Sequence, residues 1–322
     1  MTQAARREIP TEADVFGWFD TLSNWGRWGD DDQLGTLNHI DAADKVAAAG
    51  LVREGLTVSC AFEIETQYPA GKQQRFMIKT GERLHDPQFR PHGYSESDRV
   101  ATAGEYVGIC CHGIDVTHID ALSHMFFDRK MYNGKPAGLV TAVDGATHHA
   151  MTALRDGIVT RGVLLDIPAL RGIDYLMPGD AVFPDELDAA EARQDVTVGR
   201  GDVVLLRTGN GHRRAPEADG AGHWRHYPAW HPACLPWLFE REVAAIGHDG
   251  PQDLVPAPYP NLHVPMHAIG IVAMGLWLID NLDLETLSAT CARHGRYEFC
   301  FMLSAMLMQG ATGAPVNPLA LF

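Results

Sequence analysis

The sequence predicts a single α/β domain, and three features support this prediction. Short, almost wholly apolar runs such as Asp202–Thr208 have the composition of strands that are covered on both faces. Helix-like segments alternate with these runs, and glycines or Pro-Gly pairs such as Pro178-Gly179 bound many of them. No internal repeat, low-complexity tract or flexible linker divides the 322 residues, so we expect one domain over 1–322.

Residues 1–50 are expected to form an N-terminal arm of helices and loops. A helix around Ala13–Leu22 leads into the aromatic, glycine-punctuated loop SNWGRWGDDDQLGTLNHI. A second helix is expected over Asp41–Ala49, because Asp41 suits the N-cap position and Gly50 suits the end of a helix.

The rest of the chain alternates strand-like and helix-like segments. The strand-like runs are Leu56–Ile64, Tyr106–Cys111, Val116–Asp120, Thr160–Ile167, Asp202–Thr208 and Val243–Gly247. The expected helices are Ala137–Val143, Asp185–Arg193, Ala233–Glu242 and Leu284–Arg293. The last helix has an acidic start and a basic end, which suit the helix dipole. The polar, aromatic stretch Arg213–His231 is interpreted either as a lid over a pocket or as a solvated surface loop.

Composition and charge exclude several function classes. The formal net charge of −15, from 41 acidic and 26 basic residues, argues against a nucleic-acid partner, which would require clustered Lys and Arg. No signal-like apolar segment or membrane-spanning run is visible, so we expect a cytoplasmic protein with no membrane partner. The six cysteines show no CxxC pair, and we expect reduced, mostly buried thiols rather than an activated nucleophile at Cys110 or Cys111.

The segment His112–His124 carries the strongest chemical signal. In an extended chain, residues two apart point to the same face, so His118 and Asp120 are expected to project together into one cavity. Imidazole nitrogen and carboxylate oxygen are ligands that reach a divalent ion at about 2.0–2.2 Å. A single histidine in an apolar context is usually structural. Four ionisable groups within thirteen residues would be costly to bury without a cation.

Two further histidines of this segment are expected to complete the site. Gly113 allows the backbone to turn, so His112 can return to the same ion. His124 lies four residues after Asp120 and could be a ligand, but proton transfer suits it better because catalytic metals keep a position open for water.

A second cluster in the C-terminal third is a weaker candidate. It contains His263, His267 and Asp280, and Pro265 argues against a helix that would pair the two histidines. The sequence Gly247-His248-Asp249-Gly250 follows a strand-like run and is a weak candidate for reaching a pocket from a strand end.

In this segment the sequence resembles the cyclase family of metal-dependent hydrolases, which includes bacterial kynurenine formamidase, isatin hydrolase and trans-dienelactone hydrolase. The family motif is His-x-Gly-Thr-His-x-Asp-x-x-x-His, and Thr117–His124 matches its second half position by position. The first half departs, because Ile114 stands where the leading histidine would fall, and a turn two residues longer would let His112 take that place. The resemblance to the longer branch of the family extends over nearly the whole chain, through Ser23–Gly29, Tyr132–Gly134, Thr160–Asp166, Gly201–Val204, Arg207–Gly209 and Thr312–Pro318.

The resemblance implies a swivelling β/β/α fold, in which central, barrel-like sheets are flanked by helices. It also implies that His267 and Asp280 complete a second metal site, although Asp280 is shorter than the glutamate of kynurenine formamidase. Members of the family commonly form homodimers or homotetramers. The resemblance therefore implies that this chain forms a homodimer or a homotetramer as well.

These features together predict hydrolysis of an amide, lactam, lactone or ester. Zn or Mn, as one or two ions, would be held by His112, His118 and Asp120, with His124 as a general base near its ordinary pKa of about 6.5. The residues expected to contact a small, planar or aromatic substrate are Trp25, Phe126, Tyr132 and Asn133.

Two other function classes remain open on the sequence. One is a metal-dependent lyase or an iron oxygenase that uses two histidines and a carboxylate. The other is a non-catalytic metal-binding module, because structural zinc favours closed, often cysteine-rich sites and Cys110 and Cys111 are adjacent.

Overall fold

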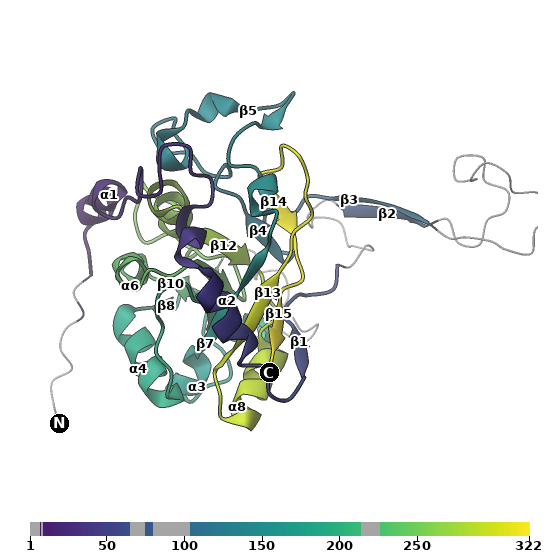
Figure 1. The fold of residues 1–322 in the computed structure, drawn as a ribbon. Coiled ribbons are helices and arrows are strands. Elements are labelled where there is room, and N and C mark those ends of the chain that lie inside the picture. Colours follow the sequence, from purple (N-terminus) through teal and green to yellow (C-terminus); the bar gives the residue numbers. More distant parts are fainter. Residues whose placement is uncertain (1–6, 8, 65–74, 80–103, 214–225) are drawn as a thin grey trace, which may run out of the picture.

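A nine-stranded sheet forms the centre of the computed structural model, which describes residues 7, 9–64, 75–79, 104–213 and 226–322 (Figure 1). In order across the sheet the strands are β1 (Thr57–Ser59), β15 (Leu319–Leu321), β13 (Glu298–Leu303), β7 (Ile158–Asp166), β9 (Val203–Arg207), β11 (Ala245–His248), β12 (Trp277–Asp280), β4 (His118–Asp120) and β14 (Gly313–Pro315). Strands β7, β9, β11 and β12 run parallel, and the pairs on either side of them are antiparallel. The predicted α/β class is therefore confirmed.

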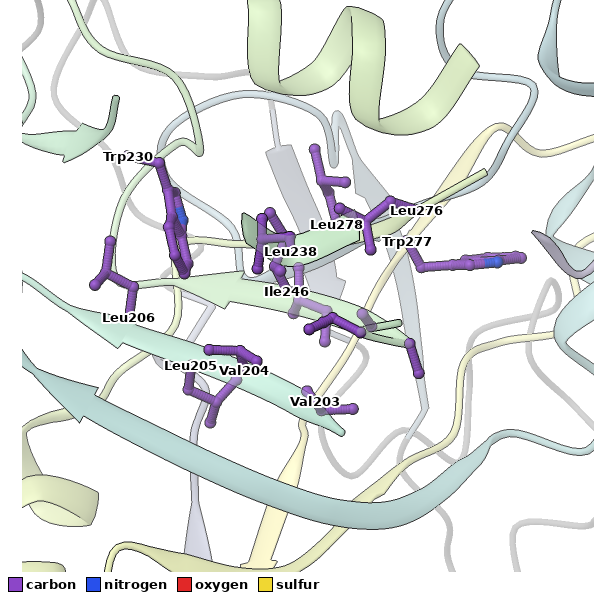
Figure 2. Close-up of a cluster of buried hydrophobic side chains, with 14 of the residues drawn as sticks. Val203, Val204, Leu205, Leu206, Trp230, Leu238, Ile246, Leu276, Trp277 and Leu278 are labelled. Atoms are coloured by element: carbon purple, nitrogen blue, oxygen red, sulfur yellow. The ribbon is translucent and has the colours of Figure 1, made fainter. Parts of the chain in front are cut away.

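The parallel strands contain the hydrophobic core. Every residue of β9 and β11 is buried, which matches the unbroken apolar character of these runs in the sequence. Figure 2 shows Val203 to Leu206 and Ile246 packed near Leu238 and Trp230. Gly247 permits this close packing, since a Cβ there would lie 2.6 Å from side-chain carbons of Leu205 and Leu282.

Helices flank the sheet (Figure 1). They are α1 (Glu12–Thr21), α2 (Ala42–Ala49), α3 (Ile167–Arg171), α4 (Pro184–Gln194), α5 (Asn210–Arg213), α6 (Cys234–Glu240), α7 (Pro265–His267) and α8 (Glu285–His294). The expected helices at α1, α2, α4, α6 and α8 are confirmed within two residues at each end. The Asp41 side chain caps α2, as predicted, by accepting hydrogen bonds from the amides of Ala43 and Asp44 at 2.7 and 3.0 Å.

The helix expected over Ala137–Val143 is wrong. The segment forms a short 3-10 turn (Ala137–Leu139) and then β5 (Val140–Thr141), which pairs with β6 (Gly145–Ala146). Val143 is 91% exposed, so a helix there would have had no apolar face to bury. β-Branched residues followed by Asp144-Gly145 suit a hairpin better than a helix.

The interpretation of Arg213–His231 as one lid or surface loop is also corrected in part. Residues 214–225 lie outside the described residues. The end of the stretch is core, because β10 (Ala229–Trp230) pairs with β8 (Ala181–Val182) and both of its residues are fully buried.

The remaining elements are short. They are β2 (Arg75–Lys79), β3 (Glu105–Ile109), the 3-10 turns Gly35–His39, Tyr132–Gly134 and Met151–Leu154, and a π-helix over Ala268–Met274 that continues α7. The run expected as a strand over Tyr106–Cys111 thus contributes β3 to a separate two-stranded antiparallel sheet with β2, and not to the large sheet. Among the described helices, none is long and apolar enough to cross a membrane.

Strand β4 positions the candidate site. It lies between β12 and β14 and is antiparallel to both. Its register places His118 opposite Asp280, so the segment predicted from the histidine motif and the C-terminal cluster meet at the ends of two neighbouring strands.

Candidate metal centre

Asp120 lies at the centre of the site. His118 and Asp120 are both buried and lie on one face of β4, while Ile119 between them packs into the core. The Nε2 atom of His118 lies 3.6 Å from Oδ1 of Asp120. The Nδ1 atom of His118 is 2.8 Å from the carbonyl of Val116, which orients the ring so that Nε2 faces Asp120.

His112 returns to the same carboxylate. Gly113 has a φ of 130°, and Nδ1 of His112 lies 2.8 Å from Oδ1 of Asp120. On the other side of the ring, Nε2 is 3.0 Å from the hydroxyl of Thr312. Gly313 leaves room for the imidazole, because a Cβ there would lie 2.4 Å from its Cε1. The longer turn therefore brings His112 into the position that Ile114 does not fill.

His124 faces the opposite oxygen. Its Nε2 is 4.0 Å from Oδ2 of Asp120, and its ring stacks on that of His112 with centroids 3.9 Å apart. Burial lowers the pKa of His124 to about 4, and the neighbouring Asp120 carboxylate opposes that shift. The expected pKa near 6.5 is therefore corrected: the imidazole is neutral at pH 7.

The C-terminal cluster divides between the site and the surface. The Nε2 atom of His267 is 3.4 Å from Oδ2 of Asp120 and 3.4 Å from Oδ2 of Asp280. His263 is exposed, four residues earlier. Pro265 begins α7 rather than interrupting a helix, so His263 and His267 do not share a helical face.

The ligand atoms form two overlapping sets. His112, Asp120 and His124 offer atoms that all lie within 4.8 Å of one another, and so do His118, Asp120 and Asp280. Asp120 belongs to both sets. The arrangement is compatible with one ion, or with two ions that share Asp120. Because His124 belongs to the first set, it could also act as a ligand.

The environment of Asp120 fits a cation. Burial disfavours its charge, but the nitrogens of His112 and His267 hold the pKa of the carboxyl well below its ordinary range. Its two oxygens are buried, and among the described residues neither accepts a hydrogen bond of normal geometry. A divalent ion would satisfy both oxygens together with the nearby imidazole nitrogens.

The cysteines lie outside these ligand sets. Cys110 is exposed, whereas burial raises the pKa of the Cys111 thiol and the nearby Asp120 carboxylate raises it further. A thiolate at Cys111 is thus disfavoured, as a ligand and as a nucleophile.

Two site residues were not expected from the sequence. Asp253 contacts Nδ1 of His267 through its Oδ2, at 2.5 Å. Gln252 donates a hydrogen bond from Nε2 to Oδ1 of Asp280 at 2.9 Å. Neither residue stands at a recognisable spacing from its partner in the sequence, so no local pattern could have indicated them.

The weak candidate at Gly247–Gly250 has a structural role. The Asp249 carboxylate accepts hydrogen bonds from the amides of Thr208, Gly209 and Asn210 and from the Thr208 hydroxyl. It thereby fixes the turn between β9 and α5.

Three of the four residues expected to contact substrate make hydrogen bonds within the protein. The indole of Trp25 donates to the carbonyl of Val272 at 2.6 Å, and the buried Tyr132 hydroxyl donates to Asp32 at 3.0 Å. The Asn133 side chain accepts from the amide of Gly26 and donates to the carbonyls of Gly29 and Asp30. Phe126, two residues after His124, is 42% exposed.

Comparison with known proteins places the chain in a family. The family model described as "Putative cyclase" matches residues 105–252. A solved structure described as a novel cyclase is 30% identical, covers 94% of this chain and 100% of its own, and superposes with a TM-score of 0.82. Isatin hydrolase A from Labrenzia aggregata, bound to benzyl benzoate, shares the fold at 17% identity, with coverage of 87% and 98% and a TM-score of 0.56. Isatin hydrolase A from Ralstonia solanacearum shares it at 18% identity, with coverage of 98% and 99% and a TM-score of 0.55. A search of curated proteins gives no match. The similarity over almost the full length of the novel cyclase shows that this chain belongs to the cyclase family.

Proposed function

We propose that the chain is a metal-dependent hydrolase that cleaves a carbonyl C–N or C–O bond of a small cyclic or aromatic substrate. The observation that carries this proposal is the buried Asp120 carboxylate, which nitrogens of four imidazoles approach within 4.0 Å, three from the segment His112–His124 and one from α7. A buried cluster of imidazoles and carboxylates is costly in free energy when no cation is bound among them, and a divalent cation offsets that cost.

His112, His118 and Asp120 would hold one ion, and His267 and Asp280, together with Asp120, would hold a second. The donor set contains nitrogen and oxygen without thiolate, which suits Zn or Mn. When bound, the cation would lower the pKa of a water molecule toward about 7 and polarise the substrate carbonyl.

His124 is proposed to move the proton. Its imidazole is neutral at pH 7, so a ring nitrogen is free to accept a proton from the attacking water, and the pKa of about 4 that burial imposes makes the ring release this proton readily in the next step. The Asp120 carboxylate, 4.0 Å away, stabilises the imidazolium that forms. The proton then passes to the leaving nitrogen or oxygen of the substrate.

The proposed substrate class rests on two observations. Phe126, two residues after His124 in the chain, is an exposed aromatic residue, which suits a planar ligand. Proteins of the same fold include isatin hydrolases, one of them bound to a product analogue, thioisatinate. We propose a cyclic amide, formamide, lactone or aryl ester, and an assembly of two or four chains.

Metal analysis combined with activity assays tests the proposal. Protein purified without chelator is assayed for Zn and Mn, and for hydrolysis of isatin, N-formylkynurenine, a lactone and an aryl ester, with and without oxygen. We expect near-stoichiometric metal and hydrolysis that chelation abolishes and added metal restores. Activity that is indifferent to chelation, or that consumes oxygen, would contradict the proposal. Size-exclusion chromatography with light scattering tests the assembly, and a monomer at micromolar concentration would refute that part.

A further inference from the structure

The adjacent residues Gln252 and Asp253 contact both candidate ligands of the C-terminal third. Asp253 approaches His267 on α7, and Gln252 donates to Asp280 on β12. All four side chains are buried or nearly so, and Gln252 is fully buried. One dipeptide therefore links two ligands that belong to different elements.

The contact of Asp253 fixes the ring of His267. A carboxylate oxygen 2.5 Å from Nδ1 requires a proton on that nitrogen, because two lone pairs would repel at this distance. With Nδ1 committed to Asp253, Nε2 is the ring atom left to bind a cation, and it lies 3.4 Å from both Asp120 and Asp280. Asp253 is itself held by the amides of Met266 and His267, at 2.7 and 3.2 Å.

Gln252 restricts Asp280 in a comparable way. The buried indole of Trp230 donates to Oε1 of Gln252 at 2.9 Å, so the amide nitrogen must point the other way. That nitrogen donates to the carbonyl of Ile279 and to Oδ1 of Asp280, both at 2.9 Å. Oδ2 of Asp280 remains directed toward Nε2 of His267, at 3.4 Å.

We propose that Gln252 and Asp253 are positioning residues: Asp253 keeps Nε2 of His267 available as a ligand atom, and Gln252 leaves Asp280 to bind through Oδ2. The inference rests on the proposed function insofar as it requires a cation at the site. Substitution of a residue that is hydrogen-bonded to a metal ligand typically lowers metal affinity by about 10–100-fold.

The main test uses Asp253→Asn, which keeps the size of the side chain. The asparagine side chain has one acceptor oxygen where aspartate has two, so it cannot accept from the amides of Met266 and His267 and from Nδ1 of His267 at once. The preference for a proton on Nδ1 is therefore weakened. We expect Zn affinity, measured by chelator competition, to fall 10–100-fold. Gln252→Met should lower it in the same direction and offers a second variant should Asp253→Asn fail to fold.

Nuclear magnetic resonance of protein labelled with ¹⁵N-histidine and loaded with Zn provides a readout that does not depend on activity. The wild-type protein should show a strongly downfield ring proton on a nitrogen of the Nδ1 type, and His267→Gln should assign it by removing it. Asp253→Asn should shift this signal upfield or remove it. Asp249→Asn is the matched control, because that buried carboxylate serves the β9–α5 turn, and it should lower stability without changing the His267 signal or the Zn affinity.

The outcomes separate this inference from the proposed function. An Asp253→Asn protein with wild-type Zn affinity and an unchanged signal would overturn the inference, even if the enzyme is a hydrolase. Loss of affinity and of the signal would support the inference, even if no hydrolysis is found.

Discussion

Asn133→Ala should destabilise the protein without acting on substrate directly. Asn133 has a φ of 57°, in the left-handed region, and its side chain makes three hydrogen bonds to the loop of residues 26–30. Each bond contributes about 0.5–1.5 kcal/mol, and their partial exposure favours the low end, which gives about 2 kcal/mol for the three. The left-handed conformation adds about 1 kcal/mol for alanine. We expect the free energy of unfolding to fall by about 3 kcal/mol.

Asn133→Gly is the matched comparison. Glycine loses the same three bonds but adopts a positive φ without strain, so its loss should be smaller by about 1 kcal/mol. Urea unfolding of the three proteins gives these differences, and KM for a hydrolysed substrate is measured alongside. Unchanged stability together with a raised KM would refute this reasoning and favour the role in substrate binding that the sequence suggested.

Three further predictions concern the metal, the His112 ring and acid stability. Removal of the metal should lower the free energy of unfolding, by about 2.7 kcal/mol if the free metal concentration was 100 times the Kd before chelation. A melting temperature that chelation leaves unchanged would contradict this. Gly313→Ala should displace His112, whose Cε1 would lie 2.4 Å from the new Cβ, and lower kcat/KM at least tenfold; Gly138→Ala, which meets nothing within 4 Å, is the control, and equal activity of the two variants would refute the prediction. Burial and the charge of Arg27 lower the pKa of His39 to about 4, so the folded state binds fewer protons than the unfolded state between pH 6.5 and 4. Stability should therefore fall as the pH decreases through that window, by up to about 3 kcal/mol, and the slope should be shallower in His39→Gln; parallel curves would contradict this.

The parts of the fold that follow from local rules could be predicted from the sequence. The caps of α2 and the burial of β9 depend on residues that are neighbours in the chain. By contrast, the sequence could not show where the apolar run Ile269–Ile279 changes from helix to strand. It contains most of the π-helix and most of β12, which separate at Gly275 with a φ of 69°, and an unbroken apolar run has no period that distinguishes helix from strand.

The site divides along the same line. The alternation that places His118 and Asp120 on one face is local, and it could be predicted. The contacts of Asp253 with His267 and of Gln252 with Asp280 join residues 14 and 28 positions apart, across different elements. Their partners are set by how the chain packs, and no spacing in the sequence encodes that.

The sheet explains why these distant residues meet at one place. Strands β11 and β12 are parallel, so their carboxyl ends lie at the same edge of the sheet. The end of β12 supplies Asp280, and the chain that leaves β11 supplies Gln252 and Asp253. Strand β4 runs antiparallel to β12, so its first residue, His118, lies opposite Asp280, and its last, Asp120, lies opposite Leu278. Of the proposed ligands, His118, Asp120 and Asp280 lie on paired strands, where they are more rigidly placed than ligands on loops. The ion-binding set should therefore tolerate changes in the exposed segment around Phe126, where we expect substrate preference to vary while metal affinity stays constant.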